Sequence, residues 1–107
     1  NLPKFIAENF TYDGENDLYK YETNEGETKL TFEYDANTKS LTETTEKHKI
    51  IYNDGSKNII IYDNNNGTFN KILIYNYKDN ACMYGECEKH QNLITDFASN
   101  YRHMLDI

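Results

Sequence analysis

Residues 47–77, KHKIIYNDGSKNIIIYDNNNGTFNKILIYNY, decide the fold of this chain. Their three runs rich in Ile and Tyr suit a pleated, half-buried surface. Only two turn clusters, residues 53–56 and 64–67, separate the runs. Asp-Gly and Asn-Gly in these clusters supply the positive φ that tight hairpins require. The stretch therefore predicts a three-stranded antiparallel meander.

Three further runs before the meander also have strand character. Residues 18–24 place Tyr at alternate positions, and residues 29–34 alternate apolar with polar side chains, so that one face is apolar and the other solvated. The Thr-rich run 39–48 has a single strong apolar anchor, which predicts a solvent-facing strand or one near an edge. Near the start of the chain the apolar residues have helical spacing, but Pro3 fits either a short helix or an extended arm.

The middle strands of the meander are apolar on both faces, so they need a cover. Residues 57–63 carry Ile on both sides, and the middle of residues 68–77 does the same. The C-terminal segment can supply a cover because its apolar residues recur at spacings of three and four: Leu93, Ile94, Phe97, Tyr101, Met104 and Leu105. We expect an α+β, mainly β fold: a curved antiparallel meander sheet of about six strands, with a helix over residues 91–105 packed on one face.

Length and charge narrow the class of protein. A chain of 107 residues is the size of one domain, which we expect to span residues 1–107. Ten Tyr and five Phe supply material for a core. The formal net charge of -7 opposes binding to nucleic acid and to anionic lipid surfaces, since both depend on Lys and Arg. No apolar run approaches the roughly 20 residues that span a bilayer. The expected partners are a small apolar ligand or another protein.

Three features indicate a secreted protein. Cys82 and Cys87 have a spacing that can close a short loop, and we expect a disulfide between them. Asn66 and Asn9 each begin an Asn-X-Thr sequon, and Asn66 lies in an expected exposed turn. The chain begins at Asn1 rather than Met, which fits a mature protein after signal removal and equally an excised piece.

The candidate metal and catalytic residues form no motif with a known mechanism. The CxxxxC pair with His90 lacks the two-residue ligand spacings of zinc sites. The acidic turn 13–17 begins like a calcium loop, but Leu18 stands where the tight-turn Gly belongs. Zinc at the cysteines and weak calcium binding at an acidic turn stay open as alternatives. His48 and His103 accompany no nucleophile in a catalytic motif. The sequence predicts a protein that is not an enzyme and has no metal and no cofactor.

The motifs KLTFEYDANTKSLTE (29–43) and KIIYNDGSKNIIIYDNNNGTFNKILI (49–74), with Cys82 after them, resemble LolA-like and ependymin-related proteins. The resemblance covers roughly residues 27–87. It implies a curved antiparallel sheet with helices on its concave side and a lipid or other apolar ligand held between them. The ligand side that it implies is formed by Ile59, Ile61, Ile72 and Ile74, or by the alternating tyrosines, among them Tyr62 and Tyr75.

Two hypotheses on function follow from these patterns. The first is a secreted, non-enzymatic binding protein that holds a small apolar or lipid ligand between the sheet and the C-terminal helix. The alternative is a secreted interaction module, such as a surface, venom, saliva or effector component, that uses a Tyr-rich sheet face. Tyr gives such surfaces a large contact area at low entropy cost. A lined cavity favours the first hypothesis, and a filled interior with an exposed aromatic patch favours the second.

Overall fold

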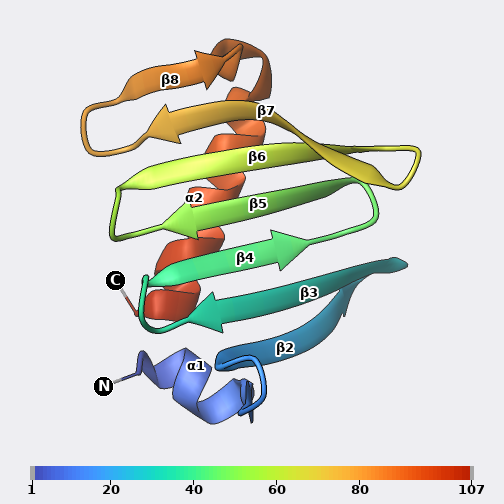
Figure 1. The fold of residues 1–107 in the computed structure, drawn as a ribbon, viewed down its shortest axis with the longest axis vertical. Helices are drawn as coiled ribbons and strands as arrows, with labels where there is room; N and C mark the ends of the chain where they lie inside the picture. The colour runs from blue at the N-terminus through green and yellow to red at the C-terminus, as the bar shows by residue number, and fades with distance from the viewer. Residues whose placement is uncertain (1, 107) are drawn as a thin grey trace.

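The computed structural model describes residues 2–106. Eight antiparallel strands follow one another in sequence order across one curved sheet, and the long C-terminal helix crosses one of its faces (Figure 1). The elements are α1 (Lys4–Asn9), β1 (Thr11–Asp13), β2 (Leu18–Glu25), β3 (Thr28–Asp35), β4 (Ser40–Thr44), β5 (His48–Asn53), β6 (Asn58–Asn65), β7 (Thr68–Asn76), β8 (Ala81–Gly85), η1 (Cys87–His90) and α2 (Gln91–Leu105). The predicted fold class is confirmed. Asn1 lies outside the described residues, and so does its interpretation as a mature N-terminus.

The number of strands and the place of one strand differ from the prediction. The sequence predicts about six strands, and β1 and β8 are additional. Both are short runs without the sustained two-residue alternation that marks a strand. The Thr-rich run that becomes β4 is not at an edge, because it pairs with β3 and β5. Glu43 is buried beside Leu41 on the same face of β4, so a charged residue helps to anchor the strand.

Four turns of one kind join the strands at one end of the sheet, where strand ends meet, and not along an outermost strand. We call this end the Asx-turn edge. In each turn the side-chain oxygen of the first residue accepts a hydrogen bond from a backbone N–H two or three residues ahead. The accepting residues are Asp13, Asp35, Asn53 and Asn76. Each turn ends in a left-handed residue: Asp17, Lys39, Lys57 or Asn80. The positive φ expected in the Asp-Gly pair 54–55 therefore lies at Lys57. At the opposite edge Asn66 and Gly67 both have positive φ, as the hairpin predicted there requires.

α2 packs one side against the sheet, and this contact forms the core. Its buried residues are Ile94, Phe97, Tyr101, Met104 and Leu105. They meet the inner face of the sheet, defined as the face toward α2, where the Tyr101 ring stacks on Tyr52 with centroids 3.4 Å apart. His90 at the start of α2 makes no side-chain capping bond. Burial contributes about 1.5–3 kcal/mol for each large apolar side chain, so packing rather than capping stabilises α2.

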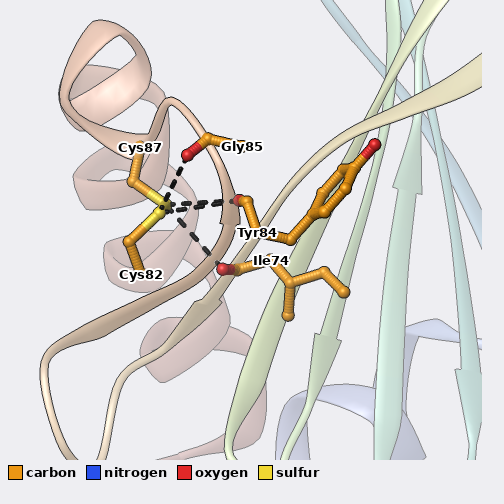
Figure 2. Close-up of a disulfide and its surroundings, with 5 residues drawn as sticks. All are labelled: Ile74, Cys82, Tyr84, Gly85 and Cys87. Atoms are coloured by element: carbon orange, nitrogen blue, oxygen red, sulfur yellow. Dashed lines mark hydrogen bonds between the residues drawn. A yellow bond between two sulfur atoms is a disulfide. The ribbon is translucent and has the colours of Figure 1, made fainter.

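A disulfide-closed loop connects β8 to α2 (Figure 2). Cys82 and Cys87 are bonded with Cα atoms 6.0 Å apart, which confirms the predicted pair. The sulfurs lie close to the carbonyl oxygens of Ile74, Tyr84 and Gly85. Disulfide sulfurs carry no hydrogen, so these approaches are sulfur–oxygen contacts rather than hydrogen bonds. Because η1 leads directly into α2, the loop fixes the start of the helix relative to β8.

We predict that Gly85→Ala destabilises the fold by at least about 2 kcal/mol. Gly85 has a φ of 78°, and a Cβ atom there would collide with the carbonyl oxygen of Ile72. Gly26→Ala is the matched control, because Gly26 has a φ of 65° and nothing within 4 Å of the added atom. Urea denaturation measures both variants. Equal losses of stability in the two would show that the close approach at Gly85 contributes nothing.

Candidate functional site

A cleft of about 410 Å³ lies between the inner face of the sheet and one side of α2, at the Asx-turn edge. We call it the α2 cleft. Its sheet wall is formed by Tyr52, Ile59, Tyr75, Tyr77 and Asn80. Its helix wall is formed by Ile94, Thr95, Ala98, Ser99 and Arg102. The cleft exists because α2 fills the middle of the inner face and leaves this margin open.

The helix wall presents one side of α2, because its residues recur at spacings of three and four. The wall changes character along the helix. Ile94 is buried and Ala98 half-buried against the core, while Ser99 and Arg102 are exposed. Arg102 forms no salt bridge with any residue from 2 to 106. The cleft thus has an apolar inner part and an unpaired guanidinium at its rim.

The sheet wall is fixed by hydrogen bonds from two tyrosines. The Tyr75 hydroxyl donates to Oδ1 of Asn80 at 3.0 Å, and the Tyr77 hydroxyl donates to Oδ1 of Asp54 at 2.7 Å. The Tyr52 ring lies 4.7 Å from that of Tyr77 and 3.4 Å from that of Tyr101 on α2. These contacts hold the rings in place, so the wall is preformed rather than assembled on binding.

Asp54 organises the tyrosines at this edge of the sheet. Its Oδ1 accepts the Tyr77 hydroxyl and also the Lys57 ammonium, at 2.9 Å. These two hydrogen bonds, the one from Tyr77 foremost, hold the pKa of the Asp54 carboxyl below its ordinary value. Burial, and next the hydrogen bond to Asp54, raise the pKa of Tyr77. Burial is also the main cause that raises the pKa of Tyr101. Tyr77 and Tyr101 are therefore neutral at physiological pH.

A second, smaller pocket of about 290 Å³ lies on the other side of Tyr101. It is lined by Leu2, Pro3, Tyr34, Lys39, Asp54, Tyr101 and Leu105. The Tyr101 hydroxyl is buried and has no hydrogen-bond partner among the residues described. An unpaired buried hydroxyl costs about 1–3 kcal/mol.

Glu43, which is buried, lies against half-buried His48, and the two form a carboxylate–imidazole pair. Nε2 of His48 lies 3.0 Å from Oε2 of Glu43, beneath α2 in a pocket of about 290 Å³. The nearby Thr45 hydroxyl accepts the backbone N–H groups of Lys47 and His48, so its lone pairs are used in the turn. The two side chains are within hydrogen-bond distance, but they have no nucleophile to activate among these neighbours.

Metal ligands and membrane spans can be assessed for residues 2–106. Within that range no group of three or more His, Cys, Asp or Glu side chains is placed to hold a metal ion. Neither helix of the same range is long and apolar enough to cross a membrane.

The structure separates the residues that the sequence places on the ligand side. Ile59 and Tyr75 line the α2 cleft, and Ile61 lies in the core. Between Ile61 and Tyr62 of β6 the register shifts, because β7 has one extra residue there, Ile72. This β-bulge breaks the two-residue alternation of β7. Ile72 therefore packs against the core, while Ile74 and Tyr62 lie on the outer face, away from α2.

Several residues of the cleft carry no signal that sequence reasoning used. Thr95, Ser99 and Arg102 share one side of α2, and a helical projection of residues 91–105 would have found them. The contact between Asp54 and Tyr77 joins residues 23 positions apart in two different turns, and no local pattern predicts it.

Comparisons of the chain with protein-family models, with curated proteins and with solved structures found no match. Function has to be inferred from the geometry of the chain itself.

We predict that Asp54→Asn destabilises the protein by about 1 kcal/mol at neutral pH. The carboxyl has a lowered pKa in the folded state, so its stabilisation is present above its unfolded pKa of about 3.9 and is lost as the pH falls through the folded pKa. The difference between variant and wild type should shrink below pH 4. Urea denaturation at stepped pH measures it. Asp79→Asn, in the next turn of the same edge, is the control, and an equal pH dependence there would contradict the assignment.

Proposed function

We propose that this protein binds a small amphipathic molecule, with an apolar body and an anionic head, in the α2 cleft. The observation that carries the proposal is the combination of a preformed apolar wall with Arg102 at the rim, which forms no salt bridge with residues 2–106. The volume of about 410 Å³ falls within the range of small-molecule sites, roughly 300–1,000 Å³. The protein is a binding protein rather than an enzyme in this proposal.

The walls of the cleft favour a ligand of this class. Ile59, Ile94 and Ala98 offer apolar contact, and the tyrosine rings extend that surface. Arg102 supplies the charge that a carboxylate or sulfate head would meet. Tyr75 and Tyr77 already use their hydroxyls within the protein, so the sheet wall presents their rings more than their polar ends. An apolar ligand between sheet and helix is also what the resemblance to LolA-like and ependymin-related proteins implies.

We predict saturable binding of a fluorescent fatty acid, cis-parinaric acid, to delipidated protein. Ser99→Trp should weaken binding at least about tenfold, because Ser99 is exposed in the helix wall and the indole would occupy the cleft. Asn92→Trp is the control, because Asn92 is exposed on α2 and is not part of the cleft wall. Fluorescence titration measures the affinities. Absence of saturable binding by the wild type, or equal binding by Ser99→Trp, would overturn the proposal.

The anionic head is tested separately with Arg102→Gln. The variant should lose affinity for a saturated fatty acid by only several-fold, because an exposed ion pair contributes little. It should keep its affinity for the matching fatty alcohol, which has no charged head. Competition against cis-parinaric acid measures both ligands. If acid and alcohol are affected equally, the cleft binds apolar ligands without recognising a charged head.

We also propose that the protein is secreted and glycosylated. The disulfide between Cys82 and Cys87 fits an oxidising compartment. The sequon residue Asn66 is exposed in the β6–β7 turn, where a glycan would have room. Asn9 is also exposed, although its amide donates to the Phe5 carbonyl oxygen at 3.0 Å at the end of α1. Asn66 is therefore the better acceptor of the two.

We predict that the chain, directed into the secretory pathway of a eukaryotic cell, gains a glycan at Asn66. Intact mass before and after peptide-N-glycosidase treatment measures the gain. Asn66→Gln should remove it, whereas Asn9→Gln should leave most of it in place. An unchanged mass in the wild type would show that neither sequon is used.

A further inference from the structure

The face of the sheet opposite α2 carries a row of apolar side chains. Strand register places Ile51 opposite Ile60, Ile60 opposite Ile74, and Ile74 opposite Tyr84. We call these four residues the outer apolar row. None of them belongs to the core that α2 closes or to the apolar residues packed against that core. Figure 2 shows the side chains of Ile74 and Tyr84 pointing away from the disulfide.

The same row changes its chemistry halfway across the sheet. On β2, β3 and β4 its members are Lys20, Glu33 and Thr42, as the solvated face of an antiparallel sheet usually requires. From β5 onward every member is apolar. Contact with solvent therefore explains the polar side chains in the first half of the row, but it does not explain the apolar side chains in the second half.

No element of the described chain covers this second half on the outer face: in Figure 1 α2 runs behind the sheet, against the inner face, and α1 lies beside β2. The apolar surface extends to the edge strand, where Tyr84 is 52% exposed and the neighbouring Met83 is 63% exposed. Large apolar side chains gathered on an uncovered face are typical of a surface that binds another molecule.

Two lysines border the outer apolar row on one side. Lys49 lies opposite Tyr62, and Tyr62 lies opposite Lys71. The three residues therefore form a second row across β5, β6 and β7, next to the outer apolar row on the same face. Within residues 2–106 neither lysine forms a salt bridge, and Lys49 Nζ sits 5.9 Å from the centre of the Tyr62 ring. A chain with a net charge of -7 thus presents a local surface that is apolar and positive.

We propose that this surface docks a partner protein through an extended or helical segment that combines apolar and acidic side chains. The apolar row would bury the partner's apolar residues, and Lys49 and Lys71 would face its carboxylates. A second copy of this chain fits poorly, because a symmetric pairing of the same surface, which consists of the outer apolar row, Tyr62 and the two lysines, offers those lysines no carboxylate. An anionic bilayer fits poorly as well, because such binding uses clusters of four to eight basic residues.

The test is to pan a display library of random 12-residue peptides against the folded, disulfide-bonded protein. Enriched peptides should carry several Asp or Glu residues among apolar ones. Their affinity should fall at least tenfold with Ile60→Thr and with Lys49→Glu/Lys71→Glu. Glu33→Gln, in the polar half of the same row, should leave it unchanged. Denaturation of each variant and its cis-parinaric acid binding would show that the fold and the α2 cleft are intact.

Three results would overturn the inference. The first is enrichment of no peptides, or of peptides without acidic residues. The second is selected peptides that bind the lysine variant as well as they bind the wild type. The third is a different occupant: self-association in sedimentation that Ile60→Thr abolishes, or binding to phosphatidylglycerol vesicles that Lys49→Glu/Lys71→Glu abolishes.

Discussion

The packing of α2 against the inner face of the sheet is the contact on which the rest of the structure depends. A meander of neighbouring strands makes mainly local backbone contacts, and only α2 joins strands that are distant in the sheet. The helix has no side-chain cap at its start, and its position is set by the disulfide loop after β8 and by buried rings such as Phe97 and Tyr101. The α2 cleft is the margin that this packing leaves uncovered.

Patterns among neighbouring residues predicted most of the fold. Features that depend on contacts between distant residues could not be predicted. The hairpin turns, the alternation in residues 29–34 and the stripe of residues 91–105 depend on neighbours in sequence, so the meander and the helix could be predicted. The bulge in β7 could not, because a single extra residue leaves the apolar composition unchanged while it moves Ile74 to the face opposite Ile72. The site shows the same limit, since Asp54 meets Tyr77 only after two turns are brought to one edge.

The tyrosines illustrate why composition alone left two functions open. On the inner face Tyr52 packs against Tyr77 and against Tyr101 of α2, and Tyr77 donates to the Asp54 carboxylate, so Tyr52 and Tyr77 are held in place in the cleft wall. On the outer face Tyr84 belongs to the outer apolar row and Tyr62 borders it. The same residue type, enriched because it suits a half-buried sheet, serves two different surfaces. The two proposals, a ligand in the α2 cleft and a partner on the outer face, therefore draw on two different faces of one molecule.

Strand β6 belongs to both surfaces, because consecutive residues point to opposite faces. Ile59 lines the cleft, Ile60 lies in the outer apolar row and Ile61 lies in the core. A one-residue slip of this strand would exchange the two faces, so the turns at both of its ends have to fix the register. The Asx turn before β6 and the Asn-Gly turn after it supply that constraint. Sliding of β6 is also costly because Ile61 is buried and the strand is paired with β5 on one side and β7 on the other. The same three strands thus present the cleft wall on one face and the outer apolar row on the other, so a change at Ile60 acts directly on the outer face alone.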